Sequence, residues 1–345
     1  MVAQATRSNC NHRLRRFRRL GPTRQAFRGP SSRSPFPERL IREIGVICGS
    51  FLLCGLTLLT AAVPPLLAQQ RVKVFIAVDM EGVTGVVGPE QLGPTGFEYQ
   101  RFREFMTAEA LAAIEGAREA GATEILVADS HGNGQNLLIE RFSPDVRIVR
   151  SWPRPLGMMQ GIDSSFAAAV FIGFHSGTAN PAGVRAHTFS SANLAGLTVN
   201  GQELSESGFG AAVAGHFGVP VVFISGDDMA TAELRALVPD VETVVVKQAL
   251  GFHSALTATP AAAQARIRER VRAAVIRRSA IAPFRVAGPV AVEITFKNYR
   301  PAEMLSYLSL FTRTASHRVR YAARDMVEAT RILQFVEEYE FGLAP

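Results

Sequence analysis

VKVFIAVDMEG, residues 72–82, is the stretch on which the fold and the predicted site both depend. Its first seven residues are mostly apolar and rich in Val, Ile and Phe, which is typical of a strand buried on both faces. Side chains alternate along a strand, so Asp79 and Glu81 are expected to project to the same side. Two carboxylates at the end of a buried strand repel each other and require a cation, a shared proton or water. The stretch therefore indicates either a metal site or a solvated turn.

The composition separates the first 70 residues from the rest of the chain. They contain eleven Arg and two Glu, which gives +9 in a chain whose formal net charge is +7. The remaining residues carry about −2, so the basic pI does not indicate nucleic-acid binding. The three cysteines, Cys10, Cys48 and Cys54, also lie in this first part. A metal bound farther along the chain must therefore be held by His, Asp or Glu.

The first 70 residues show two patterns of their own. Residues 1–43 are rich in Arg, Ser and Pro and lack apolar periodicity, which is typical of a disordered leader. Residues 44–70 contain an uncharged apolar run behind a basic flank, which predicts a signal peptide or, since the run is long enough, a membrane anchor. Either would export the protein to the periplasm or the extracellular space, with membrane contact only through this segment. If the true start lies downstream, the protein is instead cytoplasmic.

After residue 70, predicted strands and helices alternate. Strands are expected over 72–78, 124–128, 146–150, 167–174, 219–225 and 241–246, and helices over 102–117, 136–142, from 205, from 231 and over 259–278. Asn200-Gly201 is a strong hairpin signal within residues 197–204. Strand–helix–strand units place their strands parallel with right-handed crossovers. The fold class is therefore α/β over residues 71–282, with a mostly parallel sheet flanked by helices. Strands over 289–296 and 318–322 predict a smaller α+β domain over residues 283–345.

Four of the predicted strands end in side chains of the kinds that bind metals. They are followed by Asp79 and Glu81, by Asp129 and His131, by His175, and by Asp227 and Asp228. Ligands of open α/β sheets bind at the carboxyl ends of the strands, so we expect one shared site. Imidazole with carboxylate suits zinc, manganese or iron, and this inventory exceeds the needs of one tetrahedral zinc. A two-metal site is favoured, with His187 as a general acid or base.

Some of these residues have alternative roles. Asp227 and Asp228 could cap the next helix, and Asp129 could orient a metal ligand from behind. Met80 points away from its carboxylate neighbours and is predicted to pack in the core. The first strand is not followed by a glycine-rich phosphate loop, so nucleotide binding is not predicted.

A set of longer motifs resembles one known family. The segments are AVDMEGVTG at 77–85, VADSHG at 127–132, FIGFHSG at 171–177, GVRAHTFS at 183–190, VNGQELSESG at 199–208, ISGDD at 224–228 and VKQALG at 246–251. They resemble the dinuclear-zinc D-aminopeptidases of the dipeptide-transport (DppA) type, which are self-compartmentalising metallopeptidases. Two further segments, ITFKNY at 294–299 and ARDMVEA at 323–329, extend the resemblance, which covers about residues 71–340.

The resemblance implies that Asp79 bridges two zinc ions per subunit and that His187 is catalytic. It also implies that the metal shell is completed by Glu81, His131, His175 and Glu206. Glu206 enters only in this way, since the residues themselves place it merely in the first turn of a helix.

The family's activity follows as an expectation. Its members hydrolyse short peptides with N-terminal D-amino acids, such as D-Ala-D-Ala, by a metal-bridged hydroxide, and they form decamers. We therefore expect a homo-oligomeric, zinc-dependent D-aminopeptidase. The alternatives are another dinuclear metal amidohydrolase or L-peptidase, and an exported metal- or peptide-binding protein without activity.

Overall fold

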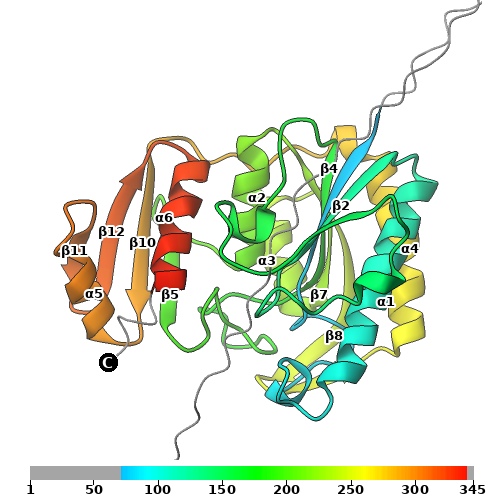
Figure 1. Ribbon diagram of the computed structural model, residues 1–345, viewed down its shortest axis with the longest axis horizontal. Helices are drawn as coiled ribbons and strands as arrows, with labels where there is room; N and C mark the ends of the chain where they lie inside the picture. The colour runs from blue at the N-terminus through cyan, green and yellow to red at the C-terminus, as the bar shows by residue number, and fades with distance from the viewer. Residues whose placement is uncertain (1–70, 340–345) are drawn as a thin grey trace, which may run out of the picture. The chain divides into compact units, whose positions relative to one another are not determined.

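The structure is a computed structural model that describes residues 71–339 (Figure 1). The leader predicted over 1–43 and the signal peptide or anchor predicted over 44–70 lie outside the described residues. Within residues 71–339, no helix is both long and apolar enough to cross a membrane. The described part contains two sheets, one of seven strands and one of five.

The seven-stranded sheet has the order β3-β2-β1-β4-β7-β8-β9. All neighbouring pairs are parallel except β8 and β9. The strands are β1 (Lys73–Val78), β2 (Glu124–Asp129), β3 (Arg147–Val149), β4 (Ala168–Phe174), β7 (Val221–Asp227), β8 (Glu242–Gly251) and β9 (Ser254–Thr257). Strands β4 and β7 are buried along their whole length, as the apolar runs in the sequence predict for strands covered on both faces.

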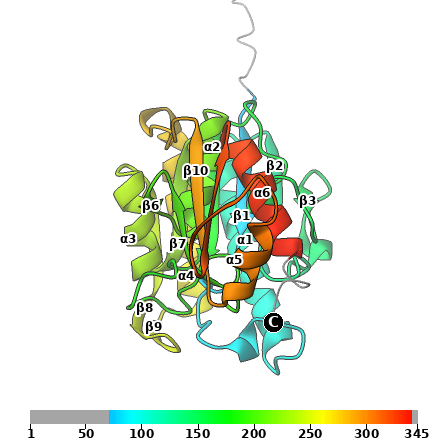
Figure 2. The same ribbon diagram turned by 90° about the vertical axis from the view of Figure 1, so that its left-hand side faces the viewer.

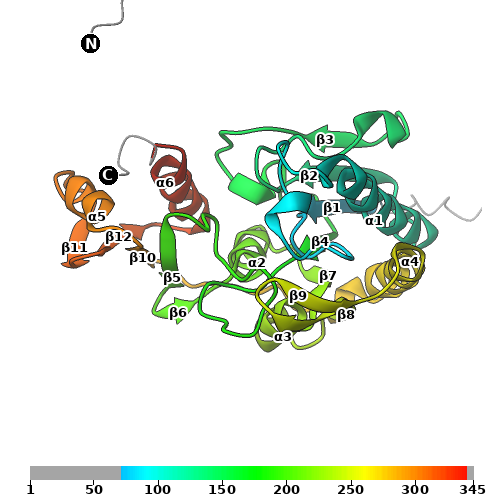
Figure 3. The ribbon, with the colours of Figure 1, turned by 90° about the horizontal axis from the view of Figure 1, so that it is seen from below.

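Helices cover the two faces of this sheet (Figure 3). Helices α1 (Tyr99–Glu119) and α4 (Pro260–Ile276) pack against each other on one face, and α2 (Glu206–His216) and α3 (Asp228–Leu237) lie on the other. The first pair approaches closely because Gly116 has no side chain: a Cβ there would lie 2.3 Å from the carbonyl oxygen of Arg268. The short 3-10 helices are η1 (Pro89–Gln91), η2 (Ile139–Arg141), η3 (Gly157–Met159) and η4 (Arg278–Ala280).

The five-stranded sheet is antiparallel, with the order β11-β12-β10-β5-β6 (Figure 1). Figure 2 shows it from the left-hand side of Figure 1, with β10 toward the viewer. Its strands are β5 (Leu194–Val199), β6 (Gln202–Glu203), β10 (Val290–Phe296), β11 (Thr312–Ala315) and β12 (Arg318–Ala323), with helices α5 (Tyr299–Leu305) and α6 (Met326–Tyr339). Alternate residues of β10 and β12 are buried, which is the pattern of a sheet with one covered face. Helix α6 packs on this sheet and also contacts α2 of the first layer.

The predicted fold class is confirmed, and so is the hairpin. Asn200 and Gly201 form its tip with φ values of 49° and 81°, the left-handed conformation that such a tight turn requires. The domain boundary at residue 283 remains a prediction. The second sheet draws its strands from both sides of that boundary, since residues 194–203 pair with β10.

Two local predictions were wrong, and two short strands were not predicted. Residues 136–142 form only the short η2, because the backbone N–H groups of Asn136 and Leu137 are bound by the Asp129 carboxylate. The helix expected from residue 231 begins at Asp228, and strands β9 and β11 were not predicted. These two strands are exposed and short, so they lack the apolar runs that identify the central strands.

Candidate metal centre

Side chains from three parallel strands converge at the carboxyl edge of the large sheet. Asp79 and Glu81 follow β1, His131 follows β2, and His175 follows β4. Strand β1 lies between β2 and β4, so the chain leaves it toward one side of the sheet and returns on the other. Such a switch in strand order opens a crevice where ligands bind in α/β sheets. All four residues are at most 6% exposed.

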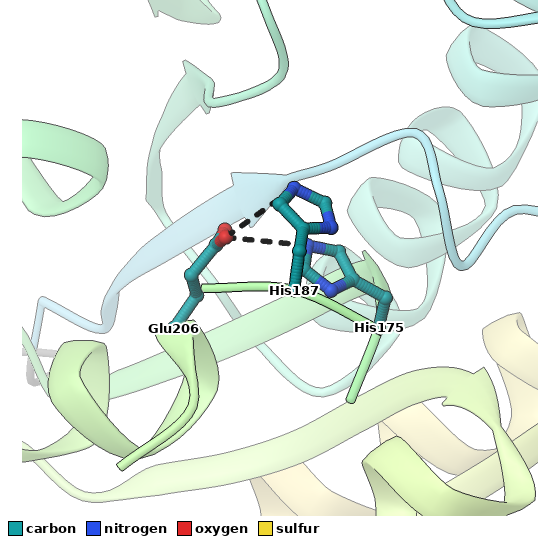
Figure 4. Close-up of side chains that lie close together, drawn as sticks. All are labelled: His175, His187 and Glu206. Atoms are coloured by element: carbon teal, nitrogen blue, oxygen red, sulfur yellow. Dashed lines mark ion pairs between the residues drawn. The ribbon is translucent and has the colours of Figure 1, made fainter. Parts of the chain in front are cut away.

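Two further side chains reach the same place from outside the sheet (Figure 4). Glu206 is the first residue of α2, whose start is fixed by the hydroxyl of Ser205 accepting from the backbone N–H of Gly208. His187 lies in the loop between β4 and β5, and its ring stacks on that of His175 with centroids 3.9 Å apart. Glu206 Oε1 lies 3.3 Å from His175 Nε2 and 3.7 Å from His187 Nε2.

The Asp79 carboxylate faces two histidines, one with each oxygen. Its Oδ1 lies 3.3 Å from His131 Nδ1, and its Oδ2 lies 3.3 Å from His175 Nε2. Both Asp79 Oδ2 and His175 Nε2 are buried without a hydrogen-bond partner. Two ligands bound to one tetrahedral zinc at normal lengths are about 3.3 Å apart. The spacing therefore fits ligands that share a metal ion, and the unpaired atoms are those that a metal would bind.

Glu81 completes the cluster on the side of His131. Its Oε2 lies 2.7 Å from His131 Nδ1, and its Oε1 lies 4.0 Å from His187 Nε2. Ligand atoms lie within 4.8 Å of one another in two groups, one of Asp79, Glu81 and His175 and one of His175, His187 and Glu206. His175 belongs to both groups, so the whole set is one continuous centre.

The three histidines are oriented in the same way, by a backbone carbonyl. Each has one ring nitrogen at hydrogen-bond distance from a backbone carbonyl: His131 Nε2 at 2.7 Å from Leu92, His175 Nδ1 at 3.0 Å from Ser176, and His187 Nδ1 at 2.7 Å from Arg185. An N–H donated to a carbonyl fixes the tautomer and leaves the other nitrogen as an electron-pair donor. That other nitrogen faces the carboxylates in every case. This arrangement is the usual one for metal-binding histidines.

Burial and mutual proximity shift the protonation of these groups. Burial, assisted by the nearby Glu81 carboxylate, raises the pKa of Asp79 to about 7. Burial alone would lower the pKa of His175, but Glu206 and Asp79 outweigh it and raise that pKa to about 10. Burial and the neighbouring His175 lower the pKa of His187. The cluster therefore retains protons in the absence of another cation, and His187 is the histidine kept neutral.

The backbone on either side of His187 is strained. Arg185 and Phe189 have φ values of 55° and 60°, a left-handed conformation that is uncommon outside glycine. The strain is held by hydrogen bonds: Arg185 N–H donates to the carbonyl of Phe252, and Phe189 N–H donates to Glu206 Oε1 at 2.6 Å. Strained backbone of this kind collects at functional sites. The loop is thus tied to Glu206.

Asp129 does not join the ligand groups. Its Oδ2 accepts from the backbone N–H groups of Asn136 and Leu137, and its Oδ1 accepts from the Asn136 side chain. That same amide also donates to the carbonyl of His131 at 2.6 Å. Asp129 therefore shapes the loop that carries His131, which is the orienting role considered in the sequence.

Asp227 and Asp228 also bind backbone. Asp227 Oδ1 caps α3 by accepting from Ala230 N–H, and its Oδ2 accepts from Val184 N–H in the loop of His187. Asp228 Oδ1 accepts from Ala249 N–H. The capping role of Asp227 is confirmed. Met80 is fully buried, so its predicted place in the core is confirmed as well.

Three buried ionisable side chains at or near the centre were not predicted from the residues alone. Glu206 was predicted only through the resemblance, although a Ser followed by Glu after a hairpin is a recognisable helix start. The other two, Lys247 and Glu109, are buried beneath the centre, at 2% and 1% exposure. The sequence feature that could have identified Lys247 as a buried lysine is its place as the single cation after a run of β-branched residues, VVVKQ.

Comparison with known proteins decides the family. Residues 72–335 match the D-aminopeptidase family, which is more than half of the chain. The chain belongs to this family. The D-aminopeptidase of Bacillus subtilis (strain 168) is 31% identical over 267 residues, covering 77% of this chain and 97% of that relative.

The fold of this D-aminopeptidase family member is also that of a solved relative. The structure is that of the Zn-dependent D-aminopeptidase DppA from Bacillus subtilis, described as a self-compartmentalizing protease. It superposes with a TM-score of 0.74 at 30% identity and covers 77% of this chain and 97% of its own. The resemblance seen in the sequence motifs is therefore confirmed.

Proposed function

We propose that this chain is a zinc-dependent D-aminopeptidase that binds two ions per subunit and hydrolyses short peptides with an N-terminal D-residue. The observation that carries the proposal is the Asp79 carboxylate, which directs one oxygen at His131 and the other at His175 at equal distances of 3.3 Å. A carboxylate placed in this way suits a bridge between two cations. Membership of the D-aminopeptidase family and the zinc dependence of the solved relative support the metal and the substrate class.

We propose two ligand sets around that carboxylate. His131 and Glu81 would hold one zinc ion with Asp79 Oδ1, and His175 and Glu206 would hold the other with Asp79 Oδ2. When bound, the ions would supply an activated water and a polarised substrate carbonyl. The fit rests on the donor types, on the two unpaired buried atoms and on the fixed tautomers of the histidines.

His187 is proposed as the group that moves the proton. Its Nδ1–H donates to the carbonyl of Arg185, so its Nε2 is the atom that accepts and releases a proton within the site. Burial lowers its pKa, which favours the neutral ring that can act as a base near neutral pH. His187 would take a proton from the attacking water at Nε2 and deliver it to the leaving amine.

Two proposals concern the protein as a whole. We propose a homo-oligomer, a decamer by the family resemblance, and the description of the solved relative as self-compartmentalizing supports this assembly. We also propose export, because residues 44–70 have the pattern of a signal peptide or anchor. Export would bring a D-specific peptidase next to peptides released from peptidoglycan, which contain D-alanine.

A substrate panel tests the function. Purified full-length chain with added zinc is incubated with D-Ala-D-Ala, L-Ala-L-Ala and the D- and L-Ala p-nitroanilides, and the metal content per chain is measured by elemental analysis. We expect two zinc ions per chain and release from the D-substrates that stops when a chelator removes the metal. Turnover of L-substrates alone would show an L-peptidase instead of a D-aminopeptidase. Bound zinc without any turnover would show a metal-binding protein without activity.

A further inference from the structure

Lys247 is the only buried lysine within residues 71–339, and it lies beneath the loop that begins with Glu81. Lysine occurs at three positions, 73, 247 and 297, in a sequence with 34 arginines. Lys247 is 2% exposed and lies on β8, opposite Asp227 of β7, at the edge of the sheet where the centre is built. Burying an ammonium group is costly unless its donors are paired. Its contacts should therefore show what the charge does.

The ammonium of Lys247 is fully engaged with one short segment. Its Nζ donates to the backbone carbonyls of Glu81, Val83 and Val86, the last two at 3.1 and 2.7 Å. An ammonium has three N–H groups, so each finds one carbonyl. All three acceptors lie within residues 81–86, the loop that begins with Glu81. No donor remains for a substrate, so Lys247 acts on this loop and not on the reaction directly.

The donors of the same loop are bound from other directions. Thr84 N–H donates to Glu109 Oε1 at 3.0 Å, and Gly85 N–H donates to Thr257 Oγ1 at 2.9 Å. Buried backbone groups must be paired, and here the partners come from α1 and β9. The loop is thus held by side chains from three separate elements. Lys247 is the one that binds its carbonyls.

The loop also has no room to shift. A Cβ at Gly82 would lie 1.9 Å from the carbonyl oxygen of Phe174, because the loop crosses directly over the end of β4. The carbonyl of Glu81 is held by Lys247 while its side chain reaches His131 at 2.7 Å. Backbone and side chain of Glu81 are therefore fixed together. A planar guanidinium would not point three donors at three converging carbonyls, which accounts for lysine in a chain that otherwise uses arginine.

We propose that Lys247 is a positioning residue of the metal centre: its ammonium sets the conformation of residues 81–86 and thereby places Glu81 to bind metal. The inference rests on the proposed function, since it takes Glu81 as a zinc ligand.

The test measures zinc affinity by competition with a chelator, in the full-length wild type, in Lys247→Met and in Lys73→Met. The last variant is the matched control, because Lys73 lies on β1 at the far end of the sheet and its Nζ donates to Ser165 Oγ. We expect Lys247→Met to bind the ion held by Glu81 about 10- to 100-fold less tightly than the wild type does, the loss typical of residues that support a ligand from behind. The control should retain the wild-type affinity.

Two outcomes of this experiment overturn the positioning role. In the first, Lys247→Met binds zinc as tightly as the wild type. In the second, it melts at a lower temperature but keeps its zinc affinity, which would make Lys247 a residue of general stability. A wild type that binds no zinc overturns the proposed function together with this inference, and is thereby distinguished from failure of the positioning role alone.

A second measurement uses only the wild type and remains decisive if Lys247→Met does not fold. If Lys247 favours zinc binding, then zinc must favour the Lys247 contacts by the same factor. Reductive methylation followed by peptide mass spectrometry gives the labelling rate of each lysine with and without zinc. We expect zinc to slow labelling of Lys247 at least about tenfold and to leave exposed Lys297 unchanged. Equal rates at Lys247 in both conditions would overturn the proposal.

Discussion

Charged side chains are buried at the edge of the parallel sheet and exposed on the antiparallel sheet. At the carboxyl edge of the parallel sheet, Asp79, Glu81 and Glu206 are nearly inaccessible to water and face histidines. On the open face of the antiparallel sheet, Glu293 pairs with Arg318 at 3.3 Å and Arg320 at 3.4 Å. The arginine side chains of that group are 45% and 59% exposed.

The exposed ion pairs of Glu293 and the buried cluster around Asp79 differ in how their charges are stabilised. Solvent screens the exposed pairs, so their geometry is loosely specified and their contribution is small. In the buried cluster each charge depends on its neighbours, and Asp79 Oδ2 and His175 Nε2 have no hydrogen-bond partner among the described residues. Buried atoms without hydrogen-bond partners, in a cluster of metal-binding side chains, indicate that the cluster binds a metal ion. Substitutions in the two sheets should therefore have effects that differ in kind and in size.

The largest effect is expected from Asp79→Ala. Its carboxylate faces both ligand sets, so its loss should remove both zinc ions and lower hydrolysis of D-Ala-D-Ala by at least about 10³-fold, the scale of losing one electrostatic group at a reaction centre. Elemental analysis and a peptidase assay measure the two consequences. Asp240→Ala, at an exposed aspartate, is the control. Full zinc occupancy in Asp79→Ala would refute the bridging arrangement.

His187→Ala should separate chemistry from metal binding. We expect kcat to fall by about 10²- to 10⁴-fold, the usual contribution of a general acid or base, while zinc content stays at the wild-type level. His216→Ala, at the exposed end of α2, should change neither quantity. Loss of zinc from His187→Ala would instead make His187 a ligand, and an unchanged kcat would exclude it from proton transfer.

The parallel sheet was largely predictable because its signals are local. Apolar runs such as VKVFIAV and AAAVFIGF identify buried strands, and the polar residues after them identify the edge where a site forms. Asp79, Glu81, His131 and His175 were found in this way. The structure brings all four together.

The residues that escaped prediction depend on contacts between distant parts of the chain. Lys247 lies more than 160 positions from the carbonyls it binds, and nothing near it in the sequence indicates those partners. Glu206 and Glu109 lie on helices whose patterns would suit a solvent-facing carboxylate equally well. The antiparallel sheet poses the same difficulty, since the hairpin at 194–203 joins strands about 90 residues farther on.

Glu109→Gln tests how much a buried carboxylate on α1, beside the parallel sheet, lowers the free energy of unfolding when it ionises. Burial raises the pKa of Glu109 to about 7, so its contribution to stability is fully present below its unfolded pKa of 4.5 and is lost as the pH rises through 7. The lost contribution is about 3 kcal/mol. Glutamine keeps an oxygen for Thr84 N–H but carries no charge. We expect Glu109→Gln to be more stable than the wild type at pH 8, with the difference disappearing toward pH 4.5.

Urea unfolding of the zinc-loaded protein across that pH range measures this difference. Glu115→Gln is a matched control, because Glu115 lies on the same helix and is exposed beside Arg268. It should leave the pH profile as it is in the wild type. A profile for Glu109→Gln that parallels the wild type would mean that Glu109 is ionised without cost, paired effectively with Lys247.

Glu293→Gln, in the antiparallel sheet, should have the smallest effect on stability and activity. The substitution removes two ion pairs but keeps an oxygen that can accept from Thr314 Oγ1, at 3.1 Å in the wild type. Pairs to exposed arginines contribute at most about 1 kcal/mol, and salt screens them. Urea unfolding should therefore show a loss below that value, and a smaller one in 1 M NaCl, with zinc content and kcat unchanged. A loss of zinc would show that this sheet supports the metal centre through α6 and α2, and that the two sheets are not independent.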